Sequence, residues 1–486
     1  MKILLVNPSN AFNGYHVPKL LRKMPFLSKH LNFASGSLFP PLNLALMAAY
    51  VPPDMEVEIM DGCIEPIDYT READLVGITA LTGNIVTAYE TADRFRARGT
   101  AVVMGGNHPT VLPQEALEHS DAVVVGEGDN VFPELLKDFQ KGQMKKIYKD
   151  TGLPSMEGHP IPRRDLLKAD QYLVPFTIQT SRGCPFDCYF CSVTAINGQK
   201  FRVRPVPDVI NEIKASGTKK MFFVDDIING QLKHAKELLR AMIPLKIQWG
   251  SQATINFGDD PELLRLARES GCRFLFIGLE SFVSKDFRKL GGKHIKSERL
   301  MASLQNIREE GIAIWGAFII GLESDTLESV NKTVKLAIEA QLDFAQFSIM
   351  TPLPGTQLHD QLDAAGRIYD RNWRNYSYGK LVFHPETMTH AEVEHAFTDC
   401  WRTFYKPWNI FKRHSIGSFF RSGGLLRKLL KIYGLRRLII RQMILWGSNF
   451  GVHHALSYTF KNRPEPKTFP GKAAPQIEPQ PQPVTE

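Results

Sequence analysis

The chain has 486 residues, of which 43% are hydrophobic and 23% charged, and its formal net charge is +8. This length exceeds one ordinary hydrophobic core, so we expect two or three globular domains and exclude a fibrous or wholly disordered protein. The apolar run at the N-terminus is too short for a signal peptide, and we expect no membrane-spanning helix. Six cysteines, three of them close together, favour a reducing, cytoplasmic location and cofactor binding over a disulfide framework.

Short apolar segments alternate with helical patterns through residues 1–140. We expect strands at 2–6, 57–60, 75–79, 101–104 and 122–125. This alternation predicts an α/β fold with a doubly wound, open parallel sheet. Ligands of such sheets bind beyond the carboxyl ends of the strands, although any one of these turns alone would be an ordinary connection. The residues predicted at those ends are Asn7, Leu81, Thr82, Gly105, Gly106, His108, Gly126, Glu127 and Gly128.

A second alternating region follows a segment that lacks periodicity. Residues 141–173 are rich in Lys, Pro and Gly, which predicts an interdomain linker. Within residues 174–368 we expect strands at 176–180, 221–224, 247–251, 274–279, 312–320 and 345–350, most of them followed by a helix. Six such units predict a partial (β/α)6 barrel with its chemistry at the carboxyl ends of the strands.

The basic charge is concentrated near the C-terminus. Thirteen Lys and Arg but no Asp or Glu occur from Cys400 to Pro464, so the rest of the chain is net negative. We expect residues 369–462 to be mostly helical, with an aromatic lid at 373–384. Residues 411–447 mix basic and apolar side chains, which favours a membrane surface over a basic cover for the barrel, and nucleic acid least. The proline-rich residues 463–486 are expected to be disordered.

Three cysteines lie within one short loop. Cys184, Cys188 and Cys191 have the spacing C-x3-C-x2-C, which suits three thiolate ligands of an iron–sulfur cluster with one iron left open. A tetrahedral zinc would need a fourth ligand, and the nearest histidines, His159 and His234, do not have zinc-finger spacing. Three inert core cysteines are the alternative. The glycine, proline and aspartate of the same stretch favour an exposed loop instead.

This motif, with Phe190 just before its last cysteine, resembles the signature of the radical S-adenosylmethionine (SAM) superfamily. Together with the N-terminal α/β domain it is similar to the cobalamin-dependent, class B branch. The resemblance implies that Cys184, Cys188 and Cys191 hold a [4Fe–4S] cluster whose open iron binds SAM. It implies that one electron cleaves SAM to a 5′-deoxyadenosyl radical. It also implies that the N-terminal strand ends surround the corrin ring and nucleotide tail of cobalamin.

Further roles follow from the same resemblance. Asp225 and Asp226 end the second barrel strand, where the family has a Gly-Gly-Glu-like stretch, and a carboxylate there suits the SAM ammonium group. Glu280 resembles the contact to the ribose or amino-acid part of SAM, and the element that contains Gly316 and Gly321 resembles one that packs against adenine. Helix capping is the alternative for the three carboxylates.

The chain lacks the D-x-H-x-x-G string with which some cobalamin-binding domains supply a histidine to the lower face of the corrin. We therefore expect no histidine ligand there. His108 is then expected to cap its loop or to contact the corrin edge.

The reaction that we favour is methylation of an unactivated carbon of a small-molecule or lipid-like substrate such as a hopanoid. An external donor such as ferredoxin or flavodoxin would supply electrons, and the protein would bind the inner face of the membrane through residues 411–447. Ring formation or oxidation within the same family is the first alternative. A non-catalytic cobalamin or redox sensor is the second, and it would not need Asp225, Asp226 and Glu280.

Overall fold

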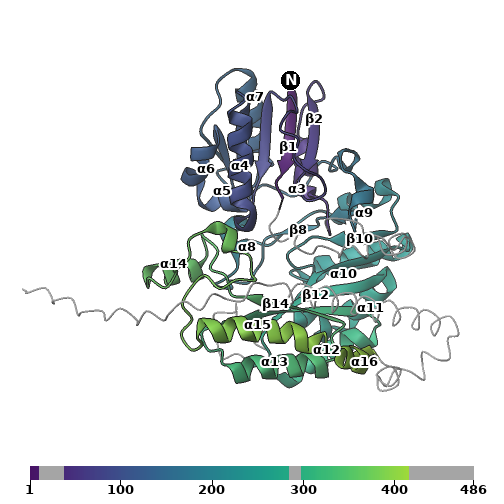
Figure 1. The fold of residues 1–486 in the computed structure, drawn as a ribbon. Coiled ribbons are helices and arrows are strands. Elements are labelled where there is room, and N and C mark those ends of the chain that lie inside the picture. The colour runs from purple at the N-terminus through teal and green to yellow at the C-terminus, as the bar shows by residue number, and fades with distance from the viewer. Residues whose placement is uncertain (10–37, 284–296, 415–486) are drawn as a thin grey trace, which may run out of the picture.

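The computed structural model describes residues 1–9, 38–283 and 297–414. They form two units, each built on a parallel sheet and stacked end to end (Figure 1). The first strand of the N-terminal unit begins at its far end and runs toward the second unit (Figure 1). Among the described residues no helix is both long and apolar enough to cross a bilayer.

The N-terminal unit contains a six-stranded sheet in the order β2-β1-β3-β4-β5-β6, with every pairing parallel. Alternate residues of β1 pack on opposite faces, Ile3 and Leu5 on one and Leu4 and Val6 on the other, because helices cover both faces. The strands are β1 (Lys2–Asn7), β2 (Glu56–Asp61), β3 (Leu75–Thr79), β4 (Ala101–Gly105), β5 (Ala122–Val125) and β6 (Ile147–Lys149). The last of these comes from the predicted linker, where three residues are too few to show alternation.

Two sets of helices enclose this sheet. α3 (Leu42–Ala49) and α7 (Val131–Gln140) pack on the Ile3 face. α4 (Ile85–Arg96) and α6 (Pro113–His119) pack on the Leu4 face, and the short α5 (Asn107–Val111) follows β4 directly. The expected doubly wound architecture is confirmed.

The second unit is an open barrel. Its six parallel strands have the order β14-β13-β12-β11-β10-β7, and within the described residues β7 and β14 are its two edges. The strands are β7 (Thr177–Ile178), β10 (Lys220–Phe223), β11 (Gln248–Ala253), β12 (Cys272–Glu280), β13 (Ala313–Ile320) and β14 (Phe344–Ile349). The outer helices are α9 (Val206–Ser216), α10 (Leu232–Met242), α11 (Pro261–Ser270), α12 (Ser297–Glu309), α13 (Leu327–Glu339) and α14 (Gln357–Ala364).

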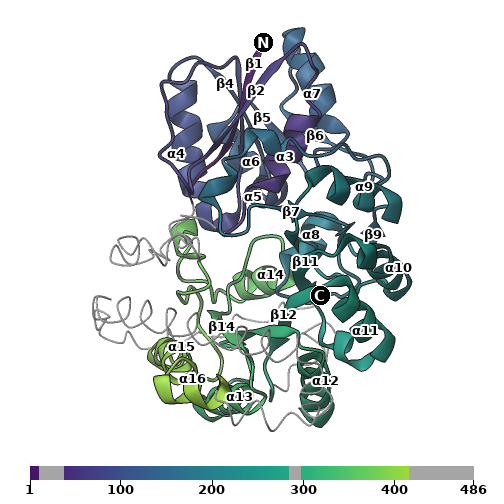
Figure 2. The same ribbon diagram turned by 90° about the vertical axis from the view of Figure 1, so that its right-hand side faces the viewer.

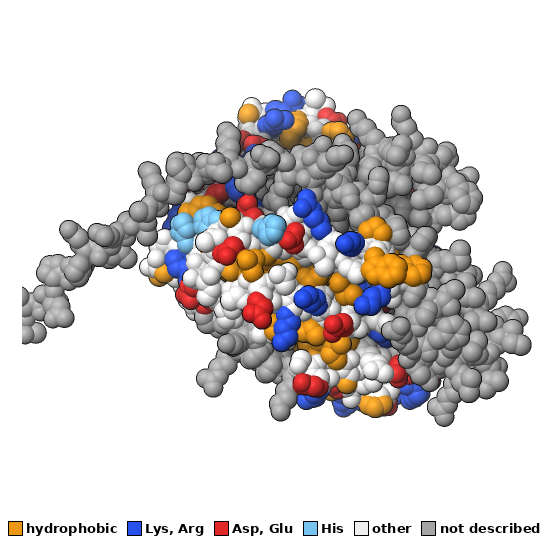
Figure 3. Space-filling view, turned by 60° about the horizontal axis from the view of Figure 1, so that its bottom comes forward, with side chains coloured by type: hydrophobic (Ala, Val, Ile, Leu, Met, Phe, Trp, Pro, Cys, Tyr) orange, Lys and Arg blue, Asp and Glu red, His pale blue; other side chains and the backbone are white. Residues whose placement is uncertain are grey.

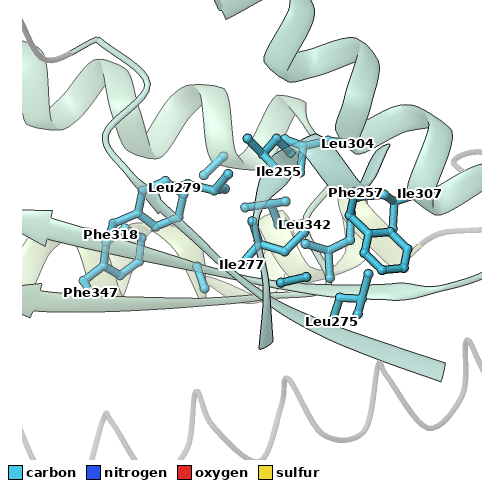
Figure 4. Packing of buried hydrophobic residues seen from close by; sticks show 14 of the residues in the cluster. Ile255, Phe257, Leu275, Ile277, Leu279, Leu304, Ile307, Phe318, Leu342 and Phe347 are labelled. Atoms are coloured by element: carbon cyan, nitrogen blue, oxygen red, sulfur yellow. The ribbon is translucent and has the colours of Figure 1, made fainter. Parts of the chain in front are cut away.

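Aromatic stacking closes the core of the barrel at its β14 edge. The rings of Phe318 and Phe347, from neighbouring strands, stack with centroids 5.3 Å apart (Figure 4). Trp401 of α15 (His390–Phe404) meets Phe347 edge to face at 5.7 Å, and the Tyr405 hydroxyl donates to the Ala345 carbonyl at 2.8 Å. The outer layer of the barrel therefore continues past the predicted boundary at residue 368. α16 (Pro407–His414) follows, and residues from 415 onward, with most of the predicted basic region and the tail, lie outside the described residues.

Residues 369–384, which we call the interdomain strap, connect the barrel to the N-terminal unit. At one point the strap is fixed to the barrel, because the Ile349 amide donates to the Tyr378 carbonyl at 2.6 Å. At another it reaches α6, where the Trp373 indole donates to the Glu115 carboxylate at 3.0 Å. The strap therefore contacts both units beside the ends of their strands.

Candidate functional site

The cysteine loop is carried by a short hairpin at the junction of the two units. β8 (Ser181–Arg182) pairs with β9 (Arg202–Val203), and the hairpin encloses the cysteines and α8 (Ser192–Asn197). Figures 1 and 2 both place α8 at this junction. Gly183 has φ +84°, and a Cβ there would lie 2.6 Å from the Lys200 carbonyl oxygen. Only glycine therefore fits at the start of the loop.

Two of the cysteines are joined by a turn. The Cys191 amide donates to the Cys188 carbonyl at 2.9 Å, while Cys184 and Cys188 are buried. No three His, Cys, Asp or Glu side chains of residues 1–9, 38–283 and 297–414 converge on a single metal ion. A cubic cluster does not require such convergence, because each thiolate binds a different iron. The arrangement fits the predicted cluster, and the ligand roles stay a prediction. Phe190 packs against the barrel core, edge to face with Tyr189.

The two aspartates after β10 have different environments. Asp225 is fully buried and accepts hydrogen bonds from the Thr180 amide, the Thr180 hydroxyl and the Ser181 amide at 2.6–2.7 Å. Its carboxylate therefore holds the strand end that leads into the cysteine loop, which leaves it no exposed surface toward SAM. Asp226 accepts from the Gly183 amide and from Asn197, and burial together with the charge of Asp225 raises its pKa to about 6. Asp226 is the better placed of the two for a ligand.

Glu280 has an unusual backbone at the end of β12. Its φ is +58°, and the pairing register with β13 shifts between Gly278 and Glu280. Its side chain runs back over Gly278, where a Cβ would lie 2.6 Å from Glu280 Oε1. Strained backbone of this kind at a strand end of a barrel is typical of a functional position. The predicted SAM contact therefore remains a prediction with geometric support.

The two glycines predicted to lie near adenine, Gly316 in β13 and Gly321 just after it, have different environments. Gly316 is buried in the strand, and a Cβ there would lie 2.7 Å from Leu342 and 2.9 Å from Leu279. Figure 4 shows Leu342 and Leu279 within the packed core. Gly316 therefore serves close packing, and an adenine contact there is not favoured. Gly321 follows the strand with φ +88°, and its amide donates to Asp325 at 3.0 Å.

A cavity of about 470 Å³ lies beyond the carboxyl ends of the N-terminal strands. Its inner wall is apolar and is formed by the sheet with α3 and α7. The barrel unit contributes Gln179, Arg182 and Arg204. Five of the predicted cobalamin-contacting residues line it: Gly105, Gly106, Gly126, Glu127 and Gly128.

The other four predicted residues do not line this cavity. Asn7 donates to Asp61 at 2.8 Å, and Leu81 is 49% exposed. His108 is fully buried, and its ring contacts the Thr82 hydroxyl at 3.1 Å and the Glu115 carboxylate at 3.3 Å. Of the two roles predicted for His108, the geometry favours capping, because a buried ring cannot contact a corrin edge.

A buried ionic cluster joins the two units, and the sequence did not predict it. Arg182 Nη1 lies 2.6 Å from Glu127 Oε2 and 2.6 Å from Asp129 Oδ2, and Arg202 also pairs with Glu127. Glu127 was predicted to contact cobalamin, and in the structure its carboxylate pairs with two arginines of the barrel unit. Although burial raises the pKa of Asp129, the hydrogen bond and charge of Arg182 hold it below the ordinary value. The one sequence signal for this ionic cluster was the position of Arg182, two residues before Cys184.

Comparisons with known proteins agree with this architecture. A family model described as the Radical SAM superfamily matches residues 178–337, and one described as a B12 binding domain matches residues 29–136. The chain is 32% identical to a bacteriochlorophyllide d C-12(1)-methyltransferase of Chlorobaculum tepidum, over 78% of this chain and 85% of that protein. It is 25% identical to the hopanoid C-2 methylase of Rhodopseudomonas palustris, over 78% and 73%.

A cyclase and a solved methyltransferase structure are also similar to this chain. The anaerobic magnesium-protoporphyrin IX monomethyl ester cyclase of Cereibacter sphaeroides is 26% identical, over 73% of this chain and 63% of that protein. The solved structure of the radical SAM methyltransferase TsrM from Kitasatospora setae, with cobalamin and a [4Fe-4S] cluster bound, has a TM-score of 0.60 at 19% identity and covers 75% of each chain. The chain therefore belongs to the family of radical SAM enzymes that carry an N-terminal B12-binding domain.

Proposed function

We propose that this enzyme methylates an unactivated carbon of a lipid-like substrate, using a [4Fe–4S] cluster, SAM and cobalamin. The observation that carries the proposal is the position of the cysteine loop. Its hairpin is ion-paired to the Gly126–Asp129 loop at the strand ends of the B12-binding domain. A radical formed at one cofactor and a methyl group carried by the other would thus lie close together. Relatives named as methyltransferases support methyl transfer over other outcomes.

The residues of this chain would bind and orient the reactants. When bound, the cluster and SAM supply a 5′-deoxyadenosyl radical that removes a hydrogen atom, and cobalamin supplies the methyl group. Cys184, Cys188 and Cys191 would hold the cluster. Asp226 would accept a hydrogen bond from the SAM ammonium group, and Glu280 would accept one from its ribose or amino-acid part. Asp225 would hold the strand end at Thr180 and Ser181 that leads into the cysteine loop. A ferredoxin or flavodoxin would supply the electrons.

Two exposed side chains at the junction of the units favour an apolar substrate. Leu81 follows β3 of the N-terminal unit and is 49% exposed, and Tyr378 of the strap is 43% exposed beside the end of β14. Apolar surface left open beside strand ends suits a substrate that buries it. The relatives named for bacteriochlorophyllide and for hopanoids support an apolar substrate for this chain.

Anaerobically reconstituted protein, incubated with trideuteromethyl-labelled SAM, a reductant and a total lipid extract, tests the proposal. We expect a lipid whose mass rises by one labelled methyl group, together with 5′-deoxyadenosine. 5′-Deoxyadenosine with an unlabelled, dehydrogenated or cyclised product would favour the ring-forming or oxidising alternative, which the similarity to a cyclase supports. No 5′-deoxyadenosine above a Cys184→Ala control would favour the sensor.

We also propose that the enzyme works at an anionic membrane surface. Trp408 and Phe411 of α16 are 67% and 51% exposed, their rings stack at 5.8 Å, and Lys412 follows them. The face turned forward in Figure 3, at the α16 end of the barrel, shows hydrophobic side chains among charged side chains of both signs. Flotation on anionic and on neutral liposomes tests this. We expect Trp408→Ser/Phe411→Ser protein to float less than the wild type on anionic vesicles, and equal flotation would contradict the idea.

A further inference from the structure

Five aromatic side chains form a continuous row on the face of the barrel sheet that lies opposite the outer helices. They come from β10, β12, β13 and β14, and we call them the aromatic wall: Phe222, Phe274, Phe276, Trp315 and Phe344. Neighbouring rings of the row have centroids 5.8–6.2 Å apart. Gly250 of β11 is paired with Phe222 on one side and with Phe274 on the other. Because Gly250 has no side chain, these two rings meet across β11.

The aromatic wall is separate from the buried core of the barrel. Alternate residues of the same strands, such as Leu275 and Ile277, are fully buried in that core (Figure 4). The aromatic side chains point to the other face, because successive side chains of a strand alternate, and all five are half-buried. In the described part of the chain none of them forms or borders the buried core. An aromatic surface that keeps contact with solvent over four strands suits an apolar ligand.

The predicted SAM contact lies on the same face as the aromatic wall. The carboxylate of Glu280 runs back over Gly278, since a Cβ on Gly278 would lie 2.6 Å from Glu280 Oε1. Gly278 follows Phe276 and Phe274 in β12 by two and four residues, which corresponds to about 7 and 13 Å along a strand. The partner of Gly278 in β13 is Ala317, which is also small and half-buried. A substrate held at SAM would therefore cover the wall if it extends about 13 Å along this face.

The other end of the aromatic wall lies near α16. Phe344 is the first residue of β14 and directly follows Asp343. Burial lowers the pKa of Arg413 in α16 to about 10, and the charge of the nearby Asp343 opposes this shift. The wall thus ends on the side of the barrel that carries the exposed Trp408 and Phe411, which we propose to contact a membrane.

We propose that the aromatic wall binds the hydrocarbon body of a lipid substrate, which lies along the inner face of the barrel with its reacting carbon near Glu280. The inference rests on the proposed function in one respect, that the substrate is lipid-like. Transfer of an apolar chain from water onto half-buried rings is favourable, and tilted rings contact such a chain along its length. The wall would then select substrates by the length and apolar character of the part that is remote from the cofactors.

Two lipid probes test this assignment on full-length protein loaded with cobalamin, which keeps the probes out of the B12-binding domain. The first is cis-parinaric acid, a long-chain fatty acid whose fluorescence rises in apolar surroundings and gives a dissociation constant. The second is palmitic acid with a diazirine in its chain, whose photochemical crosslinks are mapped by mass spectrometry of peptides. We expect these crosslinks within β12, β13 and β14, which carry most of the aromatic wall.

Phe344→Gln removes one ring of the aromatic wall and should weaken the binding of cis-parinaric acid by about 10-fold. Phe347→Leu is the matched control, because Phe347 lies in the same strand but faces the buried core, where it stacks on Phe318. The control should lower the stability of the protein and leave the dissociation constant within about twofold.

Crosslinks confined to α16 or to sites outside the barrel sheet would overturn the assignment, and so would an equal loss of binding in the two variants. Failure of the wild type to bind the probes would overturn it as well. None of these results would affect the proposed function if labelled SAM still methylates a lipid. Binding at the aromatic wall without any methylated lipid would instead refute the proposed function and leave the wall as an apolar binding site.

Discussion

Arg182 and Asp129 form an ion pair across the junction of the two units, with Nη1 of Arg182 2.6 Å from Oδ2 of Asp129. Both side chains are less than a tenth exposed. Arg182 lies two residues before Cys184, and Asp129 lies in the loop between β5 and α7. The pair therefore fixes the start of the cysteine loop relative to the strand ends of the B12-binding domain. A second carboxylate, Glu127, strengthens the same connection.

Arg182→Gln is expected to destabilise the protein strongly, because it leaves Glu127 and Asp129 buried near a neutral side chain. Removal of one partner of a buried ion pair costs about 3–5 kcal/mol. Arg163→Gln is the control, since Arg163 pairs with Asp165 at the surface and such pairs contribute about 0–1 kcal/mol. The midpoint of the first transition in urea should fall much further for Arg182→Gln. Equal shifts in the two variants would show that the interdomain pair is not needed for stability.

Gly183→Ala is expected to reduce the iron bound after anaerobic reconstitution. The new Cβ would lie 2.6 Å from the Lys200 carbonyl oxygen, so β8 and β9 must separate and move the cysteines. Gly142→Ala has a similar backbone, φ +68°, but no atom within 4 Å of the new Cβ. It should cost about 1–2 kcal/mol from backbone strain and leave the iron content unchanged. Full iron loading of Gly183→Ala would contradict the tight packing of this loop.

The fold was predictable because it depends on local patterns. Short apolar strands separated by helical periodicity predicted both parallel sheets, and the spacing of three cysteines predicted the chemistry of one loop. The strand β6 was missed because a three-residue edge strand in a Lys- and Gly-rich segment carries no periodic signal. The packing of α15 onto β14 was missed because the basic charge that follows it suggested a separate region.

The environments of individual site residues were not predictable, because their partners are distant in sequence. Glu127 follows a glycine at a strand end, which is typical of a ligand loop, yet it pairs with arginines of the barrel. Asp225 and Asp226 are adjacent, and only the fold shows that one faces the preceding strand end and the other the cysteine loop. The sequence spacing argued only against His159 as a zinc-finger ligand, and the structure places His159 in the wall of the cavity.

His159 is expected to make the stability of the protein depend on pH. Burial lowers the pKa of His159 below its ordinary value of 6.5, and the nearby Arg182 and Arg204 act in the same direction while Asp129 opposes them. The unfolded chain therefore binds a proton at a higher pH than the folded protein. The contribution of neutral His159 to the free energy of unfolding is fully present above about pH 6.5. It is lost as the pH falls toward the pKa of His159 in the folded protein.

Urea unfolding of the wild type and of His159→Gln at several pH values between about 7.5 and 5.5 measures this contribution, since the histidine titrates in that window. The unfolding free energy of the wild type should fall more steeply with decreasing pH than that of the variant. Parallel pH profiles for the two proteins would show that His159 protonates as readily in the folded state as in the unfolded state.

The strap is expected to loosen when Glu115 is neutralised. Glu115 Oε1 accepts hydrogen bonds from the Tyr89 hydroxyl at 2.9 Å and the Trp373 indole at 3.0 Å, and His108 lies 3.3 Å from it. In Glu115→Gln the charged carboxylate is replaced by a neutral amide. One carboxylate oxygen becomes a neutral carbonyl acceptor, and the other becomes an NH2 group that donates. Hydrogen bonds to a charged group contribute about 1.5–3 kcal/mol, so local opening of the strap should become roughly 10- to 100-fold more frequent.

Trypsin reports this opening, because Arg371, Arg374 and Lys380 all lie in the strap. Native Glu115→Gln protein should be cut between residues 371 and 381 much faster than the wild type, while the rates of cleavage elsewhere in the chain should not differ between the two proteins. Glu90→Gln is the matched control, since it removes only the exposed partner of Arg374, worth about 0–1 kcal/mol. Equal cleavage rates in the two variants would mean that the strap is held by its contacts to the barrel, such as the hydrogen bond from the Ile349 amide to the Tyr378 carbonyl, and not by Glu115.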